Sequence, residues 1–131
     1  MESTRNEAKT SKIYGKLFSD YKTKQFEDSV NLFYARHRRW GIDTGWFKDK
    51  VCLDAGCGGG RFVVALAKLG AKKVYGIDIS EEAVMRAKER ARERGLEAVT
   101  DIRVASVLEL PFPDHSFDYV LSSGVIHHTP D

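Results

Sequence analysis

Residues 51–62, VCLDAGCGGGRF, combine an apolar run, the carboxylate of Asp54 and four glycines at positions 56 to 60. Glycine at this density lets a backbone turn sharply, or lets a ligand come close to its N–H groups. A second acid, Asp78, ends the next apolar run, and an acid placed there can accept hydrogen bonds from both hydroxyls of a ribose. The loop and the acid together predict a site for an adenosine-containing cofactor at the carboxyl ends of parallel strands.

Two other glycine-loop sites are weaker alternatives. In the dinucleotide fingerprint G-x-G-x-x-G, counted from Gly56, the third glycine would stand at position 61, which is Arg61. This departure from the fingerprint weakens the hypothesis of an NAD or FAD site but does not exclude it. A P-loop is excluded more firmly, because no Gly-Lys-Ser/Thr follows the loop.

The elements around the loop alternate between strand and helix patterns. We expect strands at 51–54, 72–78, 101–105 and 117–123 and helices at 61–70 and 81–95. Ser80 is placed to cap the second helix, and Gly70 and Gly95 to end the two helices. The connection between the last two strands is too short and too rich in proline for an ordinary helix. This alternation predicts an α/β fold with a mostly parallel sheet.

The region before the loop has a different composition. Residues 1–12 are polar, and we expect a disordered tail there. Residues 13–47 hold nine of the fourteen aromatic residues, and their spacing predicts amphipathic helices.

Four segments in order carry a family resemblance: LDAGCGGGRF, VYGIDIS, LPFPDHSFDYV and SSGVIHHTPD. Together they resemble the class I S-adenosylmethionine-dependent methyltransferases, and most closely the small-molecule branch that includes the ubiquinone/menaquinone-biosynthesis type. The resemblance covers about residues 46–131. It implies a Rossmann-like three-layer sandwich, in which this chain supplies strands 3-2-1-4 of a seven-stranded sheet. We therefore expect residues 48–131 to be a truncated S-adenosylmethionine-binding domain, the N-terminal part of a longer enzyme.

The resemblance also implies roles for individual residues. It places the methionine part of the cofactor on the glycine loop, the ribose hydroxyls on Asp78 and the adenine beside Ile79. Ser106 and Val107 correspond to the contacts with the adenine edge, where the family often has an aspartate at position 106. The implied cofactor-binding residues are Asp54, Gly56, Cys57, Gly58, Asp78, Ile79, Ser106, Val107 and Ser122.

The acceptor side of the site is less specified. Segments before the glycine loop often cover the site in the resembling family, so residues 13–47 are expected to form a helical lid, with Tyr14 and Tyr21 as lid residues. His127 is a candidate for the substrate mouth. Methyl transfer from a sulfonium needs neither a catalytic triad nor a metal, and we expect no metal site and assign no catalytic residue.

Three functions remain open at this stage. The first is methyl transfer from S-adenosylmethionine to a small-molecule acceptor, and the second is a non-catalytic cofactor-binding or interaction module. RNA methylation is the third, suggested by Arg36, Arg38 and Arg39, although a net charge of +2 makes nucleic acid a poor expectation.

Composition sets the remaining expectations. No run of 18 apolar residues and no secretory signal is present, and Cys52 and Cys57 suit reduced thiols, so we expect a cytoplasmic protein without a membrane span. Residues 117–123 form an apolar strand that is central in the full family fold. If it is exposed as an edge here, we expect a homodimer through it.

Overall fold

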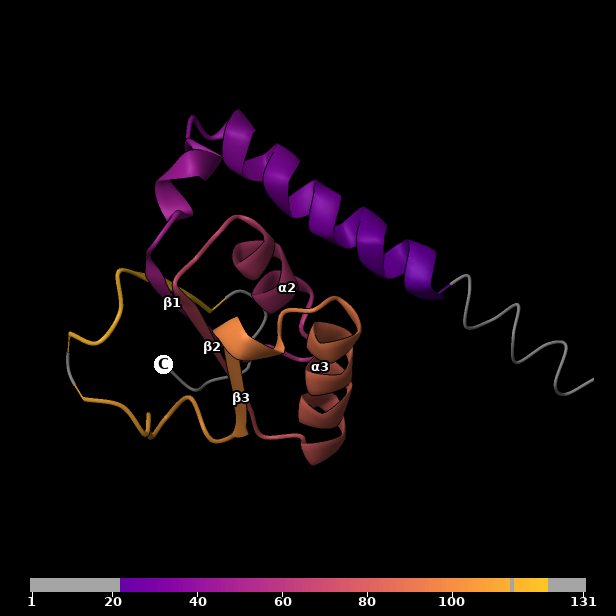
Figure 1. The fold of residues 1–131 in the computed structure, drawn as a ribbon. Helices are drawn as coiled ribbons and strands as arrows, with labels where there is room; N and C mark the ends of the chain where they lie inside the picture. The colour runs from indigo at the N-terminus through magenta and orange to yellow at the C-terminus, as the bar shows by residue number, and fades with distance from the viewer. Residues whose placement is uncertain (1–21, 114, 123–131) are drawn as a thin grey trace, which may run out of the picture.

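Four parallel strands form the centre of the fold, in a computed structural model that describes residues 22–113 and 115–122. The strands are β1 (Val51–Ala55), β2 (Lys73–Asp78), β3 (Thr100–Val104) and β4 (Tyr119–Leu121). Their order is β3-β2-β1-β4, and all three neighbouring pairs are parallel. Figure 1 labels β1, β2 and β3. The predicted α/β fold and the strand order 3-2-1-4 are confirmed.

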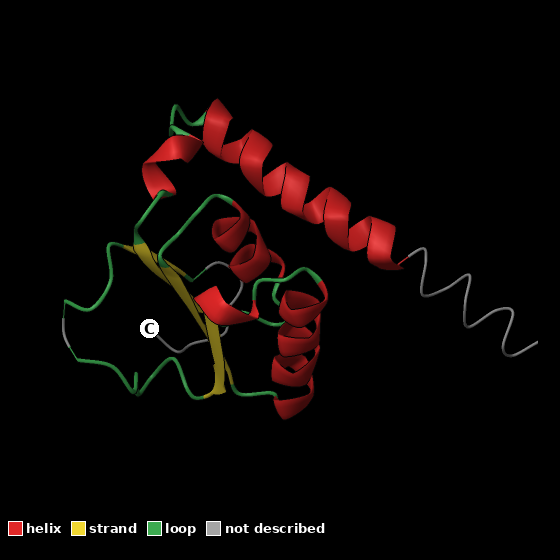
Figure 2. Cartoon of the chain, in the orientation of Figure 1, coloured by secondary structure: helices red, strands yellow, loops and turns green. Residues whose placement is uncertain are grey.

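Two helices connect the strands, α2 (Arg61–Lys68) and α3 (Glu81–Glu93) (Figure 2). Ser80 caps α3 as predicted, since its Oγ accepts a hydrogen bond from the Ala83 N–H at 3.2 Å. Gly70 and Gly95 follow the two helices with φ of +89° and +71°, the left-handed conformation that glycine adopts without strain. Two short 3-10 helices, η1 (Thr44–Phe47) and η2 (Glu97–Val99), precede β1 and β3.

An N-terminal helix, described over residues 22–39, lies across α2 (Figure 1). Phe26, Val30 and Phe33 form its buried face, which confirms the predicted amphipathic pattern. The Tyr34 hydroxyl donates to the carbonyl of Ala65 in α2 at 2.8 Å. The candidate lid residues Tyr14 and Tyr21 and the candidate His127 lie outside the described residues.

The two faces of the sheet are covered differently. On one face, α2, α3 and the N-terminal helix enclose the larger apolar cluster, to which the strands contribute Cys52, Val74 and Ile102. On the other face, Leu53, Ala55 and Ile77 are covered by the connection between β3 and β4. The described residues of that connection, 105–113 and 115–118, contain no helix, as the proline-rich sequence predicted.

Aromatic rings in that connection explain how it holds its place. Phe112 and Phe117 pack edge-on against each other and against Tyr75 of β2, with centroid separations between 5.1 and 5.7 Å. Arg103 of β3 lies over the rings of Tyr75 and Phe112. Phe112 and Phe117 therefore hold this connection against the sheet, and it returns the chain from the carboxyl end of β3 to the amino end of β4.

The fourth strand is shorter than predicted at its start. The prediction placed the first residue of this strand at position 117, but β4 begins at Tyr119. The reason is that Asp118 bonds to Val51 partly through its side chain. The Asp118 N–H donates to the Val51 carbonyl at 2.8 Å, while Asp118 Oδ2 accepts from the Val51 N–H at 2.9 Å. The Asp118 side chain thus takes the place of one backbone hydrogen bond between β1 and β4, and it fixes the residue at which β4 begins to pair with β1.

Candidate functional site

The glycine loop follows β1 and is tied to the end of β2. The N–H groups of Gly56 and Cys57 both donate to the Ile77 carbonyl at 2.8 Å. Gly56 and Gly58 have φ of +89° and +51°, so the loop takes left-handed conformations that side chains other than glycine rarely adopt. The backbone of the loop therefore favours glycine at these positions whatever it binds.

Gly60 permits a close approach between the loop and α3. Its φ is +87°, and a Cβ at this position would lie 2.8 Å from the Ala87 Cβ. In the dinucleotide fingerprint the third glycine allows close packing between helix and strand. Here α2 comes close to β2 at Gly76, where an added Cβ would lie 2.9 Å from the Val63 Cγ2, so the packing does not depend on a glycine at position 61.

Asp78 connects the loop to the start of α3. Its Oδ2 accepts from the Gly58 N–H and its Oδ1 from the Ser80 N–H, both at 2.9 Å. A carboxylate has about four acceptor positions, so the two backbone bonds orient Asp78 and leave acceptor capacity for a ligand. This geometry is consistent with the predicted ribose contact.

Asp54 is a buried carboxylate without a partner. Its side chain is 1% exposed, and neither oxygen has a hydrogen-bond partner among the described residues. Burial raises the pKa of Asp54 to about 7; the nearby positive charge of Arg61 opposes this shift and the negative charge of Asp78 adds to it. An orphaned carboxylate is costly, and such a group at the end of a strand marks a place where a cationic or donor group would be stabilised.

The strand register brings the other predicted residues to the same edge. Val104 pairs with Asp78, so Ser106 and Val107 lie just beyond the end of β3, next to the end of β2. Leu121 pairs with Asp54, so Ser122 stands beside the start of the glycine loop. Ile79 is 77% exposed, as an apolar residue would be beside an open ligand position.

Two of these residues have further contacts that limit their roles. Val107 packs against the apolar cluster of Leu53, Ala55 and Ile77, so its side chain supports the sheet. Ser106 Oγ accepts from the Leu108 N–H at 3.1 Å, which fixes a turn after β3.

Cys57 points into the core. Its side chain is 5% exposed and lies against Gly76, where an added Cβ would be 3.2 Å from the Cys57 Sγ. Burial raises the pKa of the Cys57 thiol to about 12, with smaller contributions from Asp54 and Asp78. The thiol is therefore unreactive, and the Cys57 backbone is already bonded to Ile77 through its N–H and to Gly60 through its carbonyl, so a ligand would meet only the remaining acceptor capacity of that carbonyl.

Within residues 22–113 and 115–122, no group of three or more His, Cys, Asp or Glu side chains could hold a metal ion. None of the helices in this part of the chain has both the length and the apolar character needed to cross a bilayer.

A family described as "Methyltransferase domain" matches residues 53–131, which is more than half of the chain and includes the whole candidate site. The chain belongs to the S-adenosylmethionine-dependent methyltransferases. The order of the parallel strands and the glycine loop after β1 agree with this assignment.

Individual methyltransferases support the placement. Demethylmenaquinone methyltransferase of Geobacillus stearothermophilus is 36% identical over 106 residues, covering 76% of this chain and 45% of that protein. The 27-O-demethylrifamycin SV methyltransferase of Amycolatopsis mediterranei is 40% identical over 79 residues, covering 60% of this chain and 29% of that protein. The chain thus spans about half or less of the length of these curated relatives.

A solved structure agrees in fold. The crystal structure of an S-adenosylmethionine-dependent methyltransferase from Mesorhizobium loti has a TM-score of 0.57 and 32% sequence identity, and the match covers 65% of this chain and 38% of that chain. The resemblance to the quinone-biosynthesis branch, stated above from four sequence segments, is confirmed by these relatives.

Sequence reasoning missed two residues that shape the site, Gly60 and Arg90. Arg90 of α3 donates from its Nη1 to the Gly59 carbonyl at 2.8 Å. The contact of Gly60 with Ala87 was within reach, because small residues at positions 83, 87 and 91 marked a narrow seam on that helix. Nothing local marked Arg90, since its partner is 31 positions away in the chain.

Proposed function

We propose that this chain is the cofactor-binding portion of a methyltransferase that transfers a methyl group from S-adenosylmethionine to a small molecule. The orphaned Asp54 carboxylate carries the proposal. S-adenosylmethionine presents an ammonium group, which could supply both the charge and the hydrogen-bond donors that Asp54 lacks.

The other residues at this edge suit the remaining parts of the cofactor. Asp78 has acceptor capacity for the ribose hydroxyls, and the exposed Ile79 offers an apolar surface to the adenine. Ser106 and Ser122, beyond the ends of β3 and β4, would contact the adenine edge and the reacting end. We propose the complete set Asp54, Gly56, Cys57 (through its backbone), Gly58, Asp78, Ile79, Ser106, Val107 and Ser122.

The cofactor brings a methyl group already activated on a sulfonium. The protein's own contribution would be to hold that group in line with a nucleophile and to keep water out. We propose that this half of the site supplies orientation and that no described residue acts as an acid or a base on the acceptor.

A small molecule is the acceptor class that we favour. Relatives named for menaquinone and rifamycin precursors support it. The net charge of +2 offers little attraction for a polyanion, which argues against RNA. His37, within the basic stretch at 36–39, is buried against Phe33 and Phe47, which leaves only the three arginines exposed.

One experiment separates the roles of the two acids. The wild type, Asp54→Asn and Asp78→Ala are titrated calorimetrically with S-adenosylhomocysteine and with 5′-methylthioadenosine, which lacks the amino-acid part. We expect Asp54→Asn to weaken only S-adenosylhomocysteine binding, by about tenfold or more, because a charged contact is lost. Asp78→Ala is expected to weaken both ligands.

The same titration can refute the proposal. If Asp54→Asn weakens both ligands equally, or neither, the ammonium is not its partner. If Asp78→Ala leaves both affinities unchanged, the ribose assignment fails. A chain that binds S-adenosylhomocysteine as proposed but gives no methyl transfer to any acceptor would favour the alternative of a non-catalytic binding module.

Domain division, compartment and assembly are further parts of the proposal. We propose residues 1–12 as a tail, 13–47 as a helical cap and 48–131 as a truncated cofactor domain; the cap is supported by the packing of residues 22–39 on α2. A reducing, cytoplasmic location is supported by the two free, buried cysteines, Cys52 and Cys57.

A homodimer through β4 is supported by two observations on the described sheet. β4 is its outer strand next to β1, and Val120 is 56% exposed in a segment without charge. Light scattering after size-exclusion chromatography, over a range of concentrations, tests this. A monomer at every concentration would contradict the dimer.

A further inference from the structure

Arg90 of α3 contacts both the glycine loop and the N-terminal helix. Its Nη1 donates to the Gly59 carbonyl at 2.8 Å, and its Cζ lies 4.4 Å from the centroid of the Phe26 ring. Phe26 and Gly59 come from segments far apart in the sequence, and neither Arg90 contact belongs to the predicted cofactor set. Arg90 is therefore a physical link between the cap and the loop.

One face of α3 lies close to two glycines of the loop, Gly59 and Gly60. Ala87 and Arg90 are one turn apart on α3 and so share a face. A Cβ at Gly60 would lie 2.8 Å from the Ala87 Cβ, and a Cβ at Gly59 would lie 2.3 Å from Arg90 Nη1. Gly60 is thus needed because α3 is close, independently of any ligand, whereas a side chain at Gly59 would displace the Arg90 guanidinium from its position.

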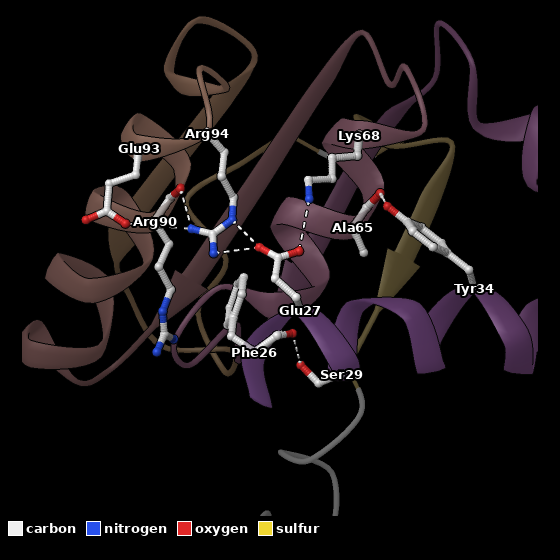
Figure 3. Close-up of polar contacts among 9 residues, drawn as sticks. All are labelled: Phe26, Glu27, Ser29, Tyr34, Ala65, Lys68, Arg90, Glu93 and Arg94. Carbon is white, nitrogen blue, oxygen red and sulfur yellow. Dashed lines mark hydrogen bonds and ion pairs between the residues drawn. The ribbon is translucent and has the colours of Figure 1, made fainter. Parts of the chain in front are cut away.

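Phe26 is held in place by a group of ionic and ring contacts between three helices, shown in Figure 3. Glu27, its neighbour, accepts from Arg94 of α3 at 2.7 Å and from Lys68 of α2 at 3.2 Å. The Cζ of Arg94 lies 4.6 Å from the same Phe26 ring. The N-terminal helix is therefore anchored where it meets Arg90, and Phe26 is only 6% exposed.

The position of the Arg90 guanidinium depends on its contacts with the Gly59 carbonyl and the Phe26 ring. Burial lowers the pKa of Arg90, and the positive charges of Arg94 and Arg86 lower it further, while Glu93 and Glu89 act in the opposite direction. A hollow of about 190 Å³ lies beside it, between the N-terminal helix and α3. Without the Phe26 ring on one side, the guanidinium would have room to leave the Gly59 carbonyl.

We propose that Arg90 is a positioning residue that couples the N-terminal helix to the cofactor loop. Four near-consecutive glycines give the loop large backbone freedom, and fixing the Gly59 carbonyl restricts the peptides beside Gly58, whose N–H is bonded to Asp78. A loop restricted before binding loses less entropy when the cofactor arrives. The cofactor part of this inference rests on the proposed function.

The test uses Arg90→Met, Arg90→Lys, Phe26→Leu and the double variant Phe26→Leu/Arg90→Met. Arg92→Met is the matched control, because Arg92 is exposed on the same helix. Two quantities are measured: the Kd for S-adenosylhomocysteine, and the hydrogen-exchange rates of residues 56–60 in the ligand-free protein. A urea unfolding curve for each variant confirms that it is folded.

For Arg90→Met we expect a Kd about tenfold weaker and faster exchange in the loop, because a charged hydrogen bond is lost. Arg90→Lys keeps the charge and is expected to recover part of both effects, while Phe26→Leu shows a loss of about threefold. Since Phe26 acts through Arg90, the double variant should bind no worse than Arg90→Met alone. Arg92→Met is expected to match the wild type.

Several results would overturn the inference. If Arg90→Met leaves the hydrogen-exchange rates of residues 56–60 unchanged, the positioning role is refuted, whether or not the cofactor binds. If the losses of affinity in the double variant are additive, the coupling is refuted and Arg90 has a purely structural role. If the wild type itself does not bind S-adenosylhomocysteine, the proposed function fails, and the exchange measurements still decide whether the loop depends on Arg90. Should Arg90→Met not fold, Arg90→Lys and Phe26→Leu carry the same comparison.

Discussion

At the scale of single residues, Asp54 is a buried carboxylate without a hydrogen-bond partner among the described residues, and its protonation should affect the stability of the fold. Its pKa rises from its ordinary value of 3.8 to about 7 on folding. The folded chain therefore keeps a proton between these two values while the unfolded chain has released it. By linkage, the contribution of Asp54 to stability is most favourable below about pH 4, falls as the pH rises, and levels off above about pH 7.

Asp54→Asn removes this titration and is expected to change the pH profile of stability. The free energy of unfolding of the variant, minus that of the wild type, should increase between about pH 4 and pH 7 by an amount on the order of 2–4 kcal/mol. Urea unfolding across this range measures it. Asp28→Asn, at an exposed carboxylate of the N-terminal helix, is the control. A difference for Asp54→Asn that does not vary with pH would show that Asp54 has its ordinary pKa in the fold.

Gly60→Ala tests the close approach of the loop to α3. The substitution meets both a φ of +87° and the Ala87 Cβ at 2.8 Å. Strain and overpacking together are expected to cost about 2–5 kcal/mol of unfolding free energy. Gly41→Ala, with φ of +77° and open space around the added Cβ, isolates the strain and should cost about 1–2 kcal/mol. Equal losses in the two variants would mean that the contact with Ala87 contributes nothing.

At the scale of elements, helix α3 contributes several contacts to the candidate site, although it lies outside the glycine loop. Its N-cap, Ser80, is bonded to Asp78 at the end of β2, and the helix presents Ala87 and Arg90 to the loop. The start of this helix is therefore bonded to the residue proposed for the ribose contact, and its middle contacts the loop.

Ser80→Ala should destabilise the protein by about 1 kcal/mol, because the Ala83 N–H loses the only side chain that caps it. Ser80→Asp is the matched control, since aspartate is an equally good cap and suits the positive end of the helix. Thermal and urea unfolding of the two variants provide the comparison. If Ser80→Asp lost as much as Ser80→Ala, the role of position 80 would not be capping.

Elements were predictable from the sequence to the extent that their signals are local. The caps at Ser80, Gly70 and Gly95 and the apolar runs of β1 and β2 fall within a few residues of the features that specify them. The start of β4 was misjudged because Asp118 takes its partner, Val51, from 67 positions away. Arg90 escaped notice for the same reason, and the burial of Asp54 without a partner is visible only once the sheet and α2 are assembled.

At the scale of the whole molecule, charge argues against RNA as a partner. The exposed Arg36, Arg38 and Arg39 lie in a chain whose net charge is +2. For single-stranded RNA at physiological salt we expect binding no tighter than the nonspecific range, about 10⁻⁴ to 10⁻⁶ M. Fluorescence anisotropy over a range of salt concentrations measures this. Binding that is much tighter than this range and falls steeply with salt would revive RNA methylation.

The whole molecule also places the proposed cofactor contacts on one edge of the sheet. Strands that are distant in sequence end side by side, so Asp54, Asp78, Ser106 and Ser122 lie along the same edge although they are spread between positions 54 and 122. The N-terminal helix joins this assembly through α2 and α3, as Figure 3 shows for Glu27, Lys68 and Arg94.

The most direct test of the central claim is a calorimetric titration of this chain with S-adenosylhomocysteine, with NAD titrated in parallel. The account predicts saturable binding of one S-adenosylhomocysteine per chain, with no measurable binding of NAD. Binding of NAD in preference to S-adenosylhomocysteine would contradict the assignment of the site at Asp54 and Asp78, and would restore the dinucleotide alternative.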